Sequence, residues 1–116
     1  METIIPEQIR RSSKMNDRVA DAMRILDQEA GRFGSIVQAE WSLDEDTKNG
    51  SSPVHLILRN NEFPEIVVEE QFTGEELANT PTLRTRLHRT WTRVLSRHSD
   101  ALGRRIGELV RSLDEE

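Results

Sequence analysis

Hydrophobic residues in the first quarter of the chain recur at intervals of three and four, a pattern typical of an amphipathic helix. At roughly 100° per residue, one face carries Val19, Ala22, Met23, Leu26 and Ala30. Pro6 suits the first helical position, where its missing N–H would have no partner. Gly31 is a natural stop. The pattern predicts one long helix from Pro6 to Ala30.

The middle of the chain alternates apolar and polar residues with a period of two, which is typical of half-buried strands. The three alternating sets lie within residues 37–43, 54–58 and 66–72. Glu70 interrupts the apolar face of the third set. A polar loop with an Asn49-Gly50 turn and a turn over residues 60–64 connect the strands, and both are too short for a parallel crossover. We therefore expect an antiparallel meander.

Two helix starts follow the strands. Thr73 and Glu76 match a capping box and predict a single helical turn after Gly74, and Thr80-Pro81 predicts the start of the last helix. The apolar face of that helix would carry Leu83, Leu87, Trp91, Val94, Leu95, Leu102, Ile106, Leu109 and Leu113. The predicted fold class is α+β, with a three-stranded antiparallel meander packed on two long helices in the order α-β-β-β-(short α)-α. We expect a single domain over residues 1–116.

The last helix is too long for a compact domain of this size. Residues 81–113 in one helix would extend ~50 Å, whereas strands of seven residues span ~23 Å. Three outcomes stay open: the helix breaks near Gly103 or Gly107, the first helix covers part of the overhang, or another chain does. The candidate interaction residues are Ile106, Leu109, Val110 and Leu113. Self-association through the long helices is the favoured hypothesis, and a different protein is the other partner considered.

Charge is distributed unevenly around a net charge of −5. Residues 80–112 hold eight arginines and two acidic residues, whereas residues 1–79 hold 16 acidic and eight basic residues. One helix sector of roughly 80°, opposite the apolar stripe, carries Arg86, Arg89, Arg93, Arg97, Arg104 and Arg111. Such a sector can bind phosphates, so nucleic-acid binding is an alternative function. The simpler interpretation is a solvated face that pairs with Asp100 and Glu108 at helical spacings.

The expected element order resembles that of the double-stranded-RNA-binding domain. In that family the second helix begins with a lysine cluster that contacts phosphates. The corresponding helix here begins Thr80-Pro-Thr-Leu-Arg-Thr-Arg86, without lysine. The resemblance therefore extends to element order alone and implies no site.

The outer face of the sheet offers the remaining chemistry. His55 with Glu40 or Glu69 could act in acid–base catalysis, and an apolar patch of Ile36, Ile57 and Val67 would lie among them if that face stays open. The chain lacks cysteine, a glycine-rich phosphate loop, a nucleophile elbow and an EF-hand loop. We therefore expect no catalytic residue, no cofactor and no metal. No apolar run approaches a membrane span, which favours a soluble, cytoplasmic protein without membrane contact.

Overall fold

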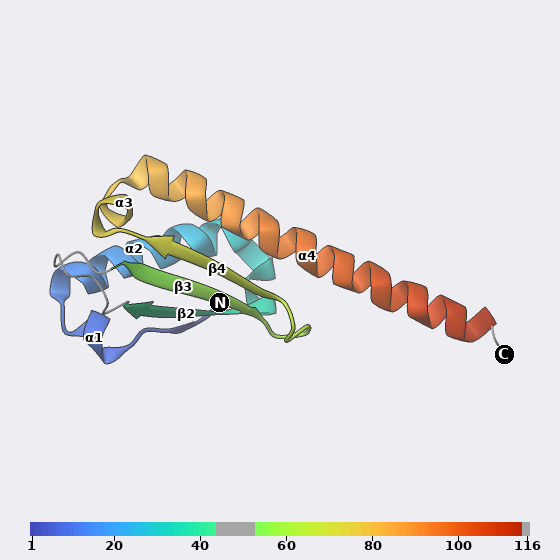
Figure 1. Ribbon diagram of the computed structural model, residues 1–116. Helices are drawn as coiled ribbons and strands as arrows, with labels where there is room; N and C mark the ends of the chain where they lie inside the picture. The colour runs from blue at the N-terminus through green and yellow to red at the C-terminus, as the bar shows by residue number, and fades with distance from the viewer. Residues whose placement is uncertain (44–52, 115–116) are drawn as a thin grey trace.

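The computed structural model describes residues 1–43 and 53–114 (Figure 1). Its elements are β1 (Glu2–Ile4), α1 (Glu7–Arg10), α2 (Ser13–Ala30), the 3-10 helix η1 (Gly31–Ile36), β2 (Val37–Leu43), β3 (Val54–Asn60), β4 (Val67–Phe72), α3 (Gly74–Ala78) and α4 (Thr80–Asp114). The predicted α+β class is confirmed. The predicted Asn49-Gly50 turn lies outside the described residues.

The sheet has four strands in the order β1-β2-β3-β4, so the three-stranded prediction was wrong by one strand. The antiparallel meander of β2, β3 and β4 is confirmed. The added strand β1 pairs parallel with β2 and places Thr3 opposite Ala39. A three-residue strand shows no alternation of its own, and its partner lies far along the chain, so local pattern could not reveal it.

The predicted continuous helix from Pro6 is in fact two helices. Pro6 is the extended N-cap of α1, which ends at Arg10. Ser12 then starts α2, because its Oγ accepts a hydrogen bond from the Met15 N–H at 3.3 Å. The predicted stop at Gly31 is confirmed, and its φ of 54° is a conformation that glycine adopts without strain.

The core lies on one face of the sheet, beneath α2 and α4 (Figure 1). Alternate strand residues point into it, including Ala39, Trp41, Leu56, Leu58, Val68 and Phe72. From α2 and α4 come Val19, Ala22, Leu26, Leu83, Leu87, Trp91 and Val94. Trp41 is buried, and so is Trp91 on the predicted apolar face of the last helix.

Helix α4 passes Gly103 and Gly107 without a break. The expected alternative of a broken helix is therefore wrong. Its N-terminal cap is Asn79 rather than Thr80, because Asn79 Oδ1 accepts from the Thr82 N–H at 3.2 Å. The molecule measures 61 × 27 × 20 Å, and the C-terminal half of α4 projects beyond the sheet (Figure 1). Across residues 1–43 and 53–114, no helix has the length and apolar content needed to cross a bilayer.

Candidate interaction surface on α4

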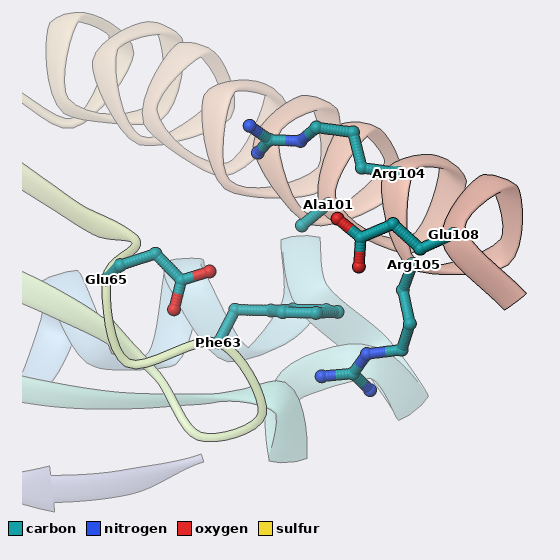
Figure 2. Close-up of a pocket in the computed structure, with 6 residues that line it drawn as sticks. All are labelled: Phe63, Glu65, Ala101, Arg104, Arg105 and Glu108. Carbon is teal, nitrogen blue, oxygen red and sulfur yellow. The ribbon is translucent and has the colours of Figure 1, made fainter. Parts of the chain in front are cut away.

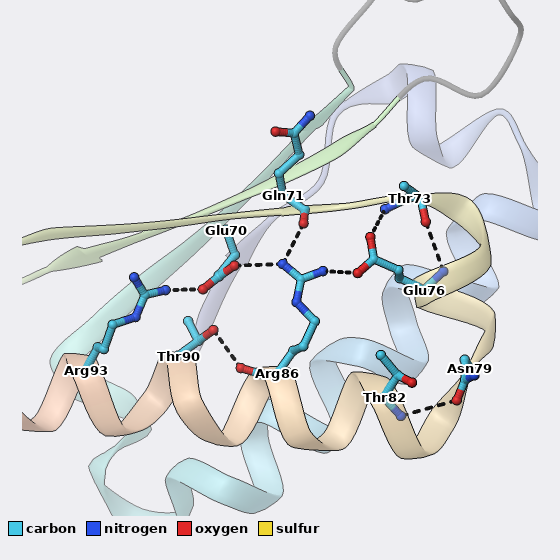
Figure 3. Close-up of polar contacts among 9 residues, drawn as sticks. All are labelled: Glu70, Gln71, Thr73, Glu76, Asn79, Thr82, Arg86, Thr90 and Arg93. Carbon is cyan, nitrogen blue, oxygen red and sulfur yellow. Dashed lines mark hydrogen bonds and ion pairs between the residues drawn. The ribbon is translucent and has the colours of Figure 1, made fainter.

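Arg86 holds the N-terminal half of α4 to the last strand of the sheet (Figure 3). Its guanidinium pairs with Glu70 at 2.9 Å and with Glu76, and donates to the Gln71 carbonyl at 2.8 Å. The same group lies over the Phe72 ring, 4.4 Å from the centroid. The strand alternation broken by Glu70 is thereby explained, because this carboxylate faces α4 and receives its arginines.

Two further arginines of the predicted sector also contact β4. Arg93 pairs with Glu70, and Arg97 donates to the Val67 carbonyl at 2.9 Å. Arg86 and Arg97 thus donate hydrogen bonds to main-chain carbonyls of the edge strand β4. Carbonyls that already accept a hydrogen bond are less available for pairing with a strand of another molecule. Within the described part of the chain, no acidic group pairs with Arg89, Arg104 or Arg111.

The expected helical ion pairs from Asp100 and Glu108 are also not formed among the described residues. Three of the six arginines therefore attach α4 to its own sheet, while the other three remain available to solvent. Anion binding by that sector stays a prediction.

The capping box before α3 lowers one pKa. Thr73 Oγ1 accepts from the Glu76 N–H at 3.1 Å, and the Glu76 carboxylate accepts from the Thr73 N–H at 3.0 Å. That backbone hydrogen bond and then the Arg86 guanidinium hold the pKa of Glu76 below 4.5. The charged carboxylate therefore stabilises the fold above pH 4.5, and this contribution is lost as the pH falls through the lowered pKa.

Glu76→Gln should consequently flatten the acid limb of the stability profile. Its amide oxygen can still accept from Thr73, but it does not titrate. Urea unfolding at a series of pH values should show a smaller loss of unfolding free energy between about pH 5 and 3 than in the wild type. Glu75→Gln is the matched control and should follow the wild-type profile. Parallel curves for Glu76→Gln and wild type would contradict this assignment.

Asn60 fixes α4 at the point where it leaves the sheet. Its Oδ1 accepts from the N–H groups of Glu62 at 2.9 Å and Phe63 at 2.8 Å, and its Nδ2 lies 2.9 Å from His98 Nδ1. Because two donors occupy Oδ1, Nδ2 must donate to His98, whose neutral ring then carries its proton on Nε2. His98 is largely buried, with 13% of its side chain exposed. The role of Asn60 was not predicted.

The last contacts between α4 and the sheet surround a small cleft of about 340 Å³ (Figure 2). Arg105 lies over the Phe63 ring at 4.3 Å and pairs with Glu62 at 3.0 Å. The cleft is lined by Phe63, Glu65, Ala101, Arg104, Arg105 and Glu108. Two guanidiniums face two carboxylates, so the lining has no net charge to attract an ion. The cleft serves as the junction between sheet and projecting helix.

Beyond this junction the apolar stripe of α4 is uncovered, as predicted for an unbroken helix. The exposed fractions are 59% for Ile106, 59% for Leu109, 50% for Val110 and 71% for Leu113. Helix α2 does not reach this segment, since it ends at Ala30 beside the sheet (Figure 1). The four predicted interaction residues therefore form a solvent-exposed apolar surface.

The stripe has the spacing of a coiled-coil seam. Its positions, separated by four and three residues in turn, are Leu95, Ser99, Leu102, Ile106, Leu109 and Leu113. They lie within a sector of roughly 80°, about a third of a turn from the side where Ala101 contacts the sheet. We call these six positions the seam.

Helix α2 borders the same line of α4 farther back. His88, Leu95 and Leu102 are seven residues apart, so they follow one another along the helix surface. His88 is 64% exposed and contacts Glu29, near the end of α2. Leu95 is 38% exposed. The seam is therefore the continuation of a line that α2 borders at His88.

The outer sheet face is half-buried or exposed. The register places Ser42 and Gln71 beside His55, whereas Glu40 and Glu69 flank Ile57. Glu40 pairs with Arg59 at 3.4 Å. Among the residues that the structure describes, no group of three acidic or histidine side chains could hold a metal ion.

Comparison with protein-family models, curated proteins and solved structures gave no match. Among the features described above, the seam contains four large apolar side chains that are exposed: Leu95, Ile106, Leu109 and Leu113.

Proposed function

We propose that this protein is a self-association module that dimerises through the projecting half of α4. The observation that carries the proposal is the exposure of Ile106, Leu109, Val110 and Leu113 on an unbroken helix. Contiguous apolar surface of this kind marks interaction sites in soluble proteins. A seam with alternating steps of three and four residues is matched by another helix with the same steps.

A second copy is favoured over an unrelated partner because the chain supplies both sides of the contact. The steps of four and three residues recur along the whole seam, so the seam of one copy has the spacing that the seam of another copy requires.

The dimer should be weak. Burying the exposed half of an aliphatic side chain stabilises by roughly 1–2 kcal/mol, so four such residues in each copy contribute roughly 8–16 kcal/mol. Association costs an estimated ~4–15 kcal/mol in lost freedom and ordering. The two terms are of similar size, so little net free energy of association remains and the dimer should form only at high protein concentration. A concentration series is thus essential to any test.

Light scattering coupled to size-exclusion chromatography tests this proposal. Across a dilution series, the mass should rise from 13.4 kDa toward twice that value. The double variant Ile106→Glu/Leu109→Glu should remain at the monomer mass, because two carboxylates would have to be desolvated in the seam. Its unfolding midpoint at low concentration should match the wild type, since both side chains are exposed in the single copy.

Arg111→Glu is the matched control, because it changes the net charge by the same amount on the opposite side of the helix. It should preserve concentration-dependent dimerisation. A wild-type mass of 13.4 kDa at every concentration would overturn the proposal. Equal weakening by both variants would assign the effect to charge rather than to the seam.

A further inference from the structure

The orientation of the two copies can be inferred from the seam, on the basis of the proposed dimer. We propose that the two α4 helices pair antiparallel, with the twofold axis at the level of Arg104. Two features support this orientation: the spacing of the seam positions and the place where α2 ends.

An antiparallel register centred on residue 104 gives every seam position a partner. Leu95 meets Leu113 of the partner subunit, Ser99 meets Leu109 of the partner subunit, and Leu102 meets Ile106 of the partner subunit. The symmetry repeats these three layers, so six layers form. A register shifted by one heptad leaves at least two seam positions without a partner, and therefore buries less apolar surface.

The end of α2 permits this arrangement and opposes a parallel one. Glu29 of α2 contacts His88, so α2 lies beside the seam line of α4 at that level. In the antiparallel register, Asp114 of the partner subunit, the last described residue of its helix, lies at the level of residue 94, about 9 Å beyond His88 along the axis. A parallel partner helix would continue past Leu95 toward His88 and meet α2. The described part of the antiparallel helix stays clear of α2.

A charged side chain beside the axis does not oppose this pairing. Arg105 borders the seam near the axis, but Glu62 and the Phe63 ring hold its guanidinium on the sheet side.

Disulfide trapping tests the orientation cleanly because the chain has no cysteine. Ser99→Cys and Leu109→Cys are prepared separately, one with an affinity tag so that the two masses differ, and are oxidised alone and as a mixture. In the antiparallel register the mixture should give the mixed disulfide as its main cross-linked product. Each variant alone should cross-link little, because its two sulfurs lie about 15 Å apart along the axis, beyond the reach of a disulfide.

Each outcome separates the orientation from the dimer itself. Efficient cross-linking of Ser99→Cys alone would indicate parallel, in-register helices and overturn the inference while the proposed dimer stands. A dimer mass in light scattering without any mixed disulfide would overturn the register. A monomer mass for the wild type and both reduced variants, with no cross-link, would overturn the proposed function and the inference together.

Discussion

Arg86→Ala should lower the free energy of unfolding by about 2–3 kcal/mol. The guanidinium is 25% exposed and its partner Glu70 is 19% exposed, so the variant leaves carboxylates in a poorly hydrated place. Glu76 loses its ion pair, and the Gln71 carbonyl loses a donor. The Phe72 ring also loses the planar group that covers it. The expected loss is limited because Arg93 still pairs with Glu70.

Chemical denaturation measures this change, with thermal unfolding as a second readout. At this chain length, 2–3 kcal/mol corresponds to a fall of roughly 10 °C in the unfolding midpoint. Arg89→Ala is the matched control, because it lies one turn away with no ion pair among the described residues. It should change stability by less than about 0.5 kcal/mol. Equal effects of the two variants would show that the Arg86 contacts contribute nothing beyond helix propensity.

Asn60→Ala should be comparably damaging, at about 3 kcal/mol. Asn60 is 4% exposed, and its Oδ1 is the acceptor for two turn N–H groups, one of them buried. The substitution also removes the donor to His98. Water cannot readily replace these partners, since Phe63 and His98 close over the turn with ring centroids 5.3 Å apart.

The neighbouring asparagine provides the control for this prediction. Asn61 makes one exposed side-chain hydrogen bond, to the Ser35 carbonyl at 2.9 Å. Asn61→Ala should therefore cost less than about 1 kcal/mol in denaturant unfolding. Hydrogen exchange supplies a local readout: the Phe63 amide should lose protection in Asn60→Ala and keep it in Asn61→Ala. Unchanged protection in both variants would contradict the assigned role of Asn60.

Local patterns predicted the elements whose signals are local. The alternation from Val37 to Leu43, the Thr73 capping box and the stop at Gly31 all correspond to observed features. The division between α1 and α2 was missed although Ser12, a good N-cap residue, marks it. There the helical periodicity of the following residues outweighed a single polar side chain.

The parts that sequence could not predict depend on contacts between distant residues. Glu70 interrupts the apolar face predicted for its strand. Its role becomes clear only from the fold, in which Arg86 and Arg93 of α4 lie opposite it and pair with it. Asn60 acquires its role only because the turn after β3 meets His98. The exposed apolar stripe was predictable for a different reason. A helix as long as α4 extends well beyond strands of six or seven residues, so its far end cannot be covered by the sheet.

The arginines on the outer edge of β4 also bear on how large an assembly can become. With the Val67 and Gln71 carbonyls already bonded, a foreign strand finds few free groups at which to begin lateral growth. In the proposed antiparallel dimer, the contact between two arms is self-complementary and buries the seam of each, so growth would stop at a pair. Removing Arg86 and Arg97 together would therefore have two effects. It would lower the stability of the fold, and it would free the carbonyls of the edge strand to pair with strands of other molecules, from which fibrillar aggregates could grow.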